Sequence, residues 1–155
     1  MIKGDLSIIR DRAHDYVIGI VTSQFNENVT GKMRQGALEV LNEYGVNYFD
    51  VEVPGAVEIP LAVKWLIEGK KCDAVIALGA VIRGETSHFD FVCNSVERGC
   101  SELQLQHGVP VAFGVLTTED GHQALARAGG AKGNKGKESA FVALEMLALK
   151  EELLG

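Results

Sequence analysis

The ten residues DAVIALGAVI, at positions 73–82, decide which fold class this chain can adopt. After Asp73 every residue is apolar or glycine, so the segment has no polar face. A short run of this kind is typical of a strand covered on both sides, as in parallel sheets between two layers of helices. We therefore predict a central strand of an α/β protein.

Apolar runs alternate with helix-like segments along the rest of the chain. Residues 16–23, 47–55 and 109–118 predict three further strands. Four strand–helix units predict a three-layer αβα fold of the flavodoxin-like type, with a central, mainly parallel four-stranded sheet and helices on both faces. The helices are expected at 33–44, at 57–70 with Pro60 in the first turn, at 89–103, at 122–128 and at 137–154.

The length of 155 residues and the lack of a linker predict a single domain spanning residues 1–155. Within residues 1–14, the segment LSIIR allows two interpretations, a further edge strand or an arm that reaches a neighbouring subunit. The last helix is apolar around much of its circumference. It either lies deep in the monomer or is partly buried at a subunit interface.

Composition excludes several classes of function. The net charge of −6 argues against sequence-independent binding to nucleic acid, which depends on Lys and Arg. No apolar run approaches the length of a membrane span, and the charged N-terminus has no signal-peptide pattern, so we expect no membrane and a cytoplasmic location. Cys72, Cys93 and Cys100 form no CxxC pair, which favours reduced thiols over a metal site.

The segment RGETSH, at 83–88, directly follows the central strand and carries the clearest functional signal. Ligands of open parallel sheets bind beyond the carboxyl ends of the strands. Thr86 or Ser87 can cap the next helix, whose free N–H groups suit a phosphate or carboxylate. A neutral His88 in the first turn could accept a proton, with Arg83 nearby as a cation. The side chain of Glu85 should point away from any bound anion.

Two other strand exits and one basic cluster complete the candidates. Phe25 and Asn26 follow the first strand, and Glu58 opens a helix after the second. The segment RAGGAKGNKGKES, at 127–139, concentrates basic residues among glycines, but it departs from the phosphate-loop pattern GxxxxGK[ST]. Taken alone, it is as easily a solvated, flexible basic loop.

Five segments occur in the order and spacing of the lumazine synthase family, which the chain resembles from about residue 16 to 149. They are FN at 25–26, VPGAVEIP at 53–60, ALGAVIRGETSHFDFV at 77–92, PVAFGVLTTE at 110–119 and RAGGAKGNKGKESA at 127–140. The resemblance implies the penultimate step of riboflavin biosynthesis, catalysed by a transferase that uses no metal or organic cofactor. In that step 5-amino-6-ribitylaminouracil and 3,4-dihydroxy-2-butanone 4-phosphate form 6,7-dimethyl-8-ribityllumazine, with release of inorganic phosphate and water.

The resemblance also implies the roles of individual residues. His88 would transfer protons and be oriented by Glu138, while Arg127 would bind phosphate. Phe25 would stack on the pyrimidine ring, and Glu58 would accept hydrogen bonds from the ribityl chain. The remaining substrate-binding residues would be Asn26, Ala56, Val57, Val81, Ile82, Gly84, Glu85, Thr86, Phe113 and Lys135.

Members of the family assemble into homo-oligomers. The resemblance implies a pentamer, assembled further into an icosahedral shell, with Phe113 and Lys135 supplied by an adjacent subunit and riboflavin synthase as a partner. At Val57 many relatives carry an aromatic residue. The alternative function is a non-catalytic shell protein that binds flavin or lumazine on the same scaffold.

Overall fold

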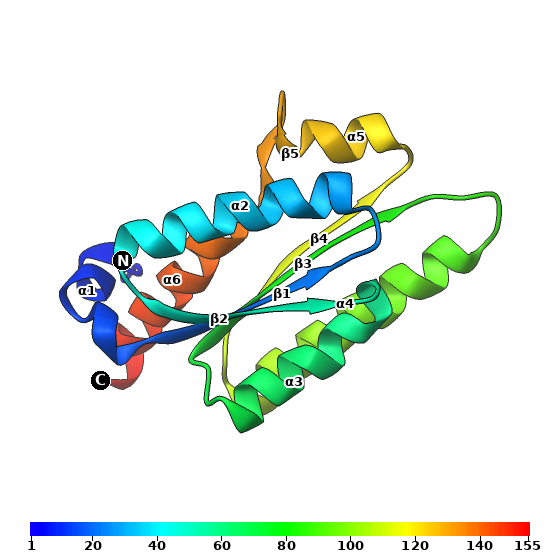
Figure 1. Cartoon of the computed structure of the whole chain (residues 1–155). Coiled ribbons are helices and arrows are strands. Elements are labelled where there is room, and N and C mark those ends of the chain that lie inside the picture. The colour runs from blue at the N-terminus through cyan, green and yellow to red at the C-terminus, as the bar shows by residue number, and fades with distance from the viewer.

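The central sheet has four parallel strands in a computed structural model that describes residues 1–155. Its strand order is β2-β1-β3-β4 (Figure 1). The strands are β1 (Val17–Ser23), β2 (Asn47–Val53), β3 (Ala74–Ile82) and β4 (Val111–Thr118). All four strands predicted from the sequence form, and the predicted parallel sheet is confirmed.

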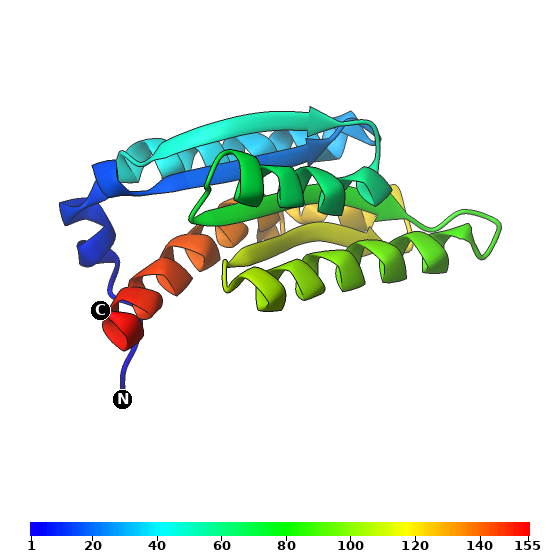
Figure 2. The ribbon, with the colours of Figure 1, turned by 90° about the horizontal axis from the view of Figure 1, so that it is seen from below.

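Helices cover both faces of this sheet, which confirms the three-layer arrangement (Figures 1 and 2). One face carries α2 (Glu27–Tyr44) and α6 (Lys135–Leu154). The other carries α3 (Ile59–Gly69) and α4 (His88–His107). A shorter helix, α5 (Gly121–Ala126), follows β4. None of the helices is both long and apolar enough to span a bilayer.

The two-faced character of β3 follows from its central position. Ile76, Leu78 and Ala80 are buried in the hydrophobic cluster formed with α2 and α6. Val75 and Ala77 alternate with them and are buried in the cluster formed with α3 and α4. Because successive side chains of a strand point to opposite faces, only a strand buried on both sides needs an unbroken apolar run.

The carboxyl ends of the strands are staggered, and this stagger creates space beyond β1. Strand β1 pairs with β3 only as far as Thr22 and Leu78, whereas β3 continues to Ile82 alongside Thr118 of β4. The chain also moves outward in opposite directions from β1 and β3, to β2 on one side and β4 on the other. Such a reversal of strand order is where open α/β sheets bind ligands.

The N-terminal segment is helical, so the edge-strand interpretation of LSIIR is wrong. Helix α1 (Leu6–Asp11) is capped by the carboxylate of Asp5, which accepts a hydrogen bond from the backbone N–H of Ser7 at 2.9 Å. Ile9 is completely buried, and Arg12 forms an ion pair of 3.0 Å with Glu151 of α6. Ile9 is the buried side chain of this short helix, and the partly buried Leu6 lies three residues before it, on the same side of a helix.

The glycine-rich basic segment is an ordered hairpin and not a flexible loop. Strands β5 (Ala128–Gly130) and β6 (Gly133–Asn134) pair antiparallel. Gly133 has a φ of 86°, which glycine adopts without strain. Asn134 then caps α6, because its Oδ1 accepts a hydrogen bond from the N–H of Lys137 at 3.1 Å.

Helix α6 lies mostly within the chain's own core. Ala140, Leu144 and Leu147 are buried in the cluster shared with α2. Val142 and Met146 are 48% and 43% exposed, so one flank of the helix remains apolar and uncovered. The interpretation of a helix deep in the monomer therefore describes the buried face of α6, and the interpretation of a subunit interface stays a prediction for its exposed flank.

Candidate active site

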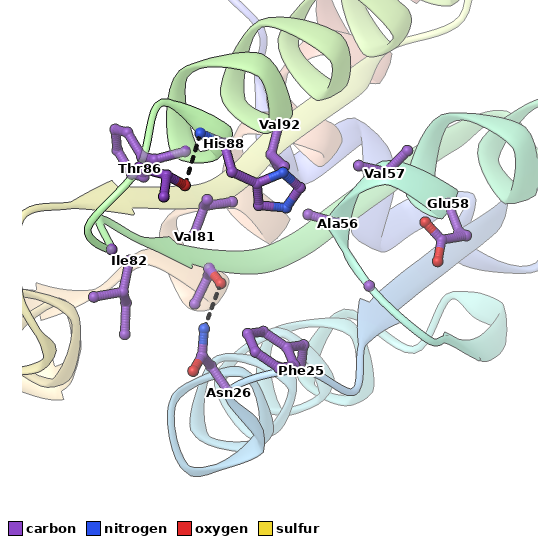
Figure 3. Close-up of a pocket in the computed structure, with 14 residues that line it drawn as sticks. Phe25, Asn26, Ala56, Val57, Glu58, Val81, Ile82, Thr86, His88 and Val92 are labelled. Atoms are coloured by element: carbon purple, nitrogen blue, oxygen red, sulfur yellow. Dashed lines mark hydrogen bonds between the residues drawn. The ribbon is translucent and has the colours of Figure 1, made fainter.

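A cavity of about 340 Å³ opens at the carboxyl ends of β1 and β3, where the strand order reverses. Three segments that the sequence identified as strand exits meet around it (Figure 3). Glu58 is the only carboxylate of the lining and His88 its only imidazole, and there is neither lysine nor arginine. The residues that line the cavity are Phe25, Asn26, Gly55, Ala56, Val57, Glu58, Ala80, Val81, Ile82, Gly84, Thr86, His88, Phe89 and Val92.

The exit of β1 places an aromatic ring at the mouth of the cavity. Phe25 is 72% exposed, although a phenylalanine is ordinarily buried. Its N–H donates to the carbonyl oxygen of Pro54 at 3.2 Å, so the backbone is tied to the loop that follows β2. An exposed aromatic ring on a backbone held in this way can stack on a planar ligand.

The exit of β2 forms one turn of 3-10 helix at Ala56–Glu58, which runs directly into α3. Pro60 lies at the beginning of α3, where its missing N–H removes no helical hydrogen bond. The side chains of Val57 and Glu58 are exposed on this turn, beside the cavity. A carboxylate at this position can accept hydrogen bonds from hydroxyl groups of a ligand.

The exit of β3 brings His88 to the cavity. Gly84 and Thr86 line the cavity, and the imidazole of His88 points into it, between Val81 and Ala56 (Figure 3). Thr86 Oγ1 accepts a hydrogen bond from the N–H of His88 at 3.3 Å. Thr86 thus bonds to the first turn of α4.

Two expectations about this turn are tested by the same geometry. Ser87 occupies the N-cap position of α4, but its side chain makes no capping hydrogen bond. The side chain of Glu85 is exposed, and the residue, which the resemblance placed among the substrate-binding residues, does not line the cavity.

Arg83 is not the free cation that the sequence placed beside this turn. Its Nε donates to Oε2 of Glu119 at 2.7 Å, and its Nη2 lies 3.5 Å from Oδ1 of Asp90. The hydrogen bond to Glu119 raises the pKa of Arg83, so the guanidinium stays charged. Two carboxylates offset that charge, and the side chain lies outside the cavity lining.

The basic residues gather instead in a second cavity of about 460 Å³, along β4. Strand β4 forms one edge of the sheet, so nothing from the same chain pairs with its outer side. Arg127 is held there by a hydrogen bond from its Nη1 to the carbonyl oxygen of Gln123 at 2.9 Å. The lining consists of Phe113, Val115, Leu116, Thr117, Thr118, Gln123, Arg127, Lys132, Lys135 and Glu138.

The structure therefore divides the predicted site residues into two groups. One group surrounds His88, and the other contains Arg127, Lys135, Glu138 and Phe113. The first cavity offers an aromatic surface and a proton carrier without a cation. The second offers three cations beside one carboxylate. An anionic substrate that must lose or gain a proton needs both sets of groups.

Several lining residues were not singled out from the sequence. Val92 follows His88 by four residues and Phe89 by three, so helical spacing could have placed it on the same side of α4. Thr117 and Thr118 pair with Val81 and Ile82, a register that only the sheet reveals. Gln123 lies in α5 and lines the second cavity because the turn after β4 brings this helix beside it. No pattern in the sequence indicated this position.

Comparison with known proteins identifies one family that the chain resembles over most of its length. The family model described as 6,7-dimethyl-8-ribityllumazine synthase matches residues 15–151. A protein of Bdellovibrio bacteriovorus named 6,7-dimethyl-8-ribityllumazine synthase is 52% identical over 137 residues. That similarity covers 88% of this chain and 76% of the relative.

Proposed function

The chain belongs to the 6,7-dimethyl-8-ribityllumazine synthase family, and from that premise we propose how its two cavities divide the work of the reaction. The enzyme is a transferase of riboflavin biosynthesis. It condenses 5-amino-6-ribitylaminouracil with 3,4-dihydroxy-2-butanone 4-phosphate to 6,7-dimethyl-8-ribityllumazine, with release of phosphate and water. The observation that supports our assignment of roles is the convergence of Phe25, Glu58 and His88 on one cavity.

The pyrimidine substrate occupies the first cavity. Phe25 stacks on the ring, and backbone groups of Val81 and Ile82 bond to its edge, where β3 extends beyond the end of β1. Ala56 and Val57 contact the ribityl chain, and Glu58 accepts hydrogen bonds from its hydroxyl groups. Val57 has an aliphatic side chain and no aromatic surface, so Phe25 supplies the stacking.

The phosphate substrate binds at the turn Gly84–Thr86 and the N-terminus of α4, whose free N–H groups attract anions. Since the first cavity has no cation, a second source of positive charge is needed. Arg127 and Lys135 of a neighbouring chain supply it. The open edge of β4 supports this arrangement, because the second cavity lies along this strand, whose outer side is unpaired within the chain.

His88 moves the protons of the reaction. The 5-amino group attacks the ketone, and loss of water gives an imine. His88 then removes a proton from the carbon next to the imine, and the phosphate leaves from the following carbon. Elimination leaves an enol, which takes a proton at its terminal carbon, loses the hydroxyl proton and becomes a methyl ketone. The ribitylamino nitrogen attacks this carbonyl group, and loss of a second water closes the ring. Glu138 of the neighbouring chain orients the imidazole, and Phe113 encloses the ring.

Assembly follows from an active site shared between chains. A contact between two different surfaces of the same chain closes into a ring if the rotation between copies permits it. We propose a pentamer of single-domain chains, assembled further into an icosahedral shell with riboflavin synthase as a partner. The three free thiols fit a reducing compartment, the cytoplasm.

The test of function is direct. The two substrates are mixed with the protein, and the absorbance of the lumazine product is followed against an enzyme-free control. Product formation with saturation in both substrates supports the synthase. Binding of the pyrimidine without product would instead support the alternative, a shell protein that binds flavin or lumazine without catalysis.

A further inference from the structure

Arg83 joins two loops that carry different parts of the proposed active site. On one side its guanidinium lies 4.3 Å above the ring of Phe89, and its Nη2 lies 3.5 Å from the carboxylate of Asp90. On the other side its Nε bonds to Glu119, in the loop between β4 and α5. Its backbone N–H also donates to the carbonyl oxygen of Thr118 at 2.9 Å.

The first set of contacts holds the beginning of α4. Phe89 and Asp90 are the two residues after His88, and Phe89 itself lines the first cavity. Between Arg83 and His88 the chain has only an exposed turn, in which a single side chain, that of Thr86, accepts a hydrogen bond, from the backbone N–H of His88. A shift of the first turn of α4 would therefore displace the imidazole and the turn Gly84–Thr86 together.

The loop that contains Glu119, the second partner of Arg83, has hydrogen bonds of its own. The N–H of Glu119 donates to Oε1 of Gln123 at 2.8 Å, and the carbonyl oxygen of Gln123 accepts the hydrogen bond from Arg127. The backbone of Glu119 is thus part of a hydrogen-bonded loop at the end of β4. The guanidinium of Arg83 ties the first turn of α4 to this loop.

The exposed fractions of the three side chains indicate that these contacts orient the residues more than they stabilise the fold. The side chains of Arg83, Asp90 and Glu119 are 39%, 56% and 61% exposed. Ion pairs so accessible to water add little to the free energy of unfolding. A guanidinium held by two carboxylates and an aromatic face nevertheless has a defined orientation, since its planar fork restricts the geometry of each contact.

We infer that Arg83 is a positioning residue of the synthase reaction, which holds the turn Gly84–Thr86 and His88 in place by clamping the start of α4 to Glu119. The inference rests on the roles proposed above for His88 and for the phosphate-binding turn. Arg83 touches neither substrate in this arrangement. Its effect on the reaction passes through the placement of His88, where a displacement of about 1 Å can cost a hundredfold in rate.

The decisive measurement is a double-mutant cycle of Arg83→Gln, Glu119→Gln and the double variant, assayed at steady state with both substrates. We expect each single variant to lower kcat by about tenfold to a hundredfold. The double variant should be no slower than the slower single variant, because both changes break one connection. Arg83→Lys should recover part of kcat, since an ammonium can pair with Glu119 but lacks the fork.

Arg10→Gln is the matched control. Arg10 pairs with one carboxylate, Glu43 at 3.1 Å, and like that of Arg83 its guanidinium lies over an aromatic ring, 4.0 Å from the ring centre of Tyr44. It lines neither of the two cavities. If Arg10→Gln and Arg83→Gln have the same melting temperature and only Arg83→Gln loses kcat, the effect is positional.

Three outcomes would overturn the inference. Unchanged kcat in both Arg83→Gln and Glu119→Gln removes any positioning role. Losses that multiply in the double variant show that the two residues act separately. A rise in KM for the phosphate substrate in Arg83→Gln, with Glu119→Gln unaffected, shows direct binding of phosphate. His88→Ala and Arg127→Ala, assayed in parallel, separate this failure from a failure of the proposed active site, because they do not depend on Arg83.

Discussion

The side-chain amide of Asn26 donates a hydrogen bond of 2.8 Å to the carbonyl oxygen of Ala80 and so joins the exits of β1 and β3 (Figure 3). The backbone of Asn26 is left-handed, with φ 65° and ψ 46°. Its carbonyl oxygen accepts the first hydrogen bonds of α2, from Val29 and Thr30. The residue was expected to contact substrate. Asn26 also lines the first cavity, and we propose that its bond to Ala80 sets the position of Phe25.

Removing this amide should weaken binding of the pyrimidine more than it weakens the fold. Asn26→Gly keeps the left-handed backbone and loses the bond to Ala80, so we expect a loss of about 1 kcal/mol in unfolding free energy. Affinity for an unreactive ribitylaminouracil analogue, measured by titration calorimetry, should fall about tenfold as Phe25 loses its fixed position. Asn26→Ala, which adds backbone strain, should be less stable than Asn26→Gly. Unaltered affinity in both variants would contradict this role.

His88→Ala should slow the reaction without unfolding the protein. General acid–base catalysis typically contributes about 10²–10⁴-fold, so the loss of kcat should fall in that range. The residue is exposed, and the hydrogen bond to Thr86 comes from its backbone and not from its imidazole, so the melting temperature should stay close to that of the unaltered chain. Steady-state turnover and a thermal unfolding curve check the two parts. Turnover equal to that of the unaltered enzyme would rule out His88 as the proton carrier.

A shared active site predicts that two inactive variants restore each other. Arg127→Ala should raise KM for the phosphate substrate, because the first cavity contains no other cation. When His88→Ala and Arg127→Ala chains are co-expressed and assemble at random, about a quarter of the sites pair an intact His88 with an intact Arg127 of the neighbour. Activity of the mixed assembly should then exceed that of either variant alone.

The control for complementation is a double variant, His88→Ala with Arg127→Ala in one chain, co-expressed with His88→Ala. No site of that mixture contains an intact His88, so it should stay inactive. If the first mixture also stays inactive while its assemblies are shown by native mass spectrometry to contain both chains, each chain builds its site alone.

Gly136 is required by the close approach of α6 to α2. A methyl group added at this position would overlap the backbone carbonyl of Met33, which cannot move without shifting α2. Gly136→Ala should therefore lower the free energy of unfolding by about 3 kcal/mol. Gly31→Ala is the matched control, because nothing lies within 4 Å of the added carbon and the residue is also helical. That variant should gain about 0.5–1 kcal/mol. Equal denaturant midpoints for the two variants would contradict this packing.

Two of the three thiols should be unreactive in the folded protein. Burial raises the pKa of Cys72 to about 11 and that of Cys100 to about 12. Thiolate is the reactive form, so at pH 8 about one Cys72 in a thousand can react with iodoacetamide. Mass spectrometry should find Cys72 and Cys100 unmodified in native protein and alkylated in urea. Equal rates in the two conditions would contradict their burial.

The raised pKa of Cys72 makes the free energy of unfolding depend on pH in the alkaline range. The pKa of folded Cys72 lies above its ordinary value of 9.0, so the unfolded chain loses this proton first. The stabilisation is present below pH 9 and is lost as the pH rises through about 11. The free energy of unfolding should therefore fall more steeply over that interval in the unaltered chain than in Cys72→Ala. Parallel curves would show that Cys72 contributes nothing.

Much of the fold could be predicted from local pattern. The unbroken apolar run of β3 and the spacing of Met33, Ala37 and Leu41 in α2 each follow from burial on particular faces, which is a local property. Helix α1 was not recognised, because it has only six residues and one buried side chain, Ile9. A segment so short does not repeat its apolar residues often enough to distinguish a helix from a strand. The hairpin β5–β6 was hidden by its glycines, which are equally typical of loops.

The sequence by itself determined the layers, the parallel sheet and the presence of Phe25, Glu58 and His88 at strand exits. Hydrophobic periodicity and the common direction of parallel strands are sufficient for that. Only the tertiary structure showed that Arg83 forms ion pairs with Glu119 and Asp90. It also showed that Arg127 lines a different cavity from His88. These facts depend on strand order, since β4 becomes an edge strand through long-range packing that no local pattern encodes.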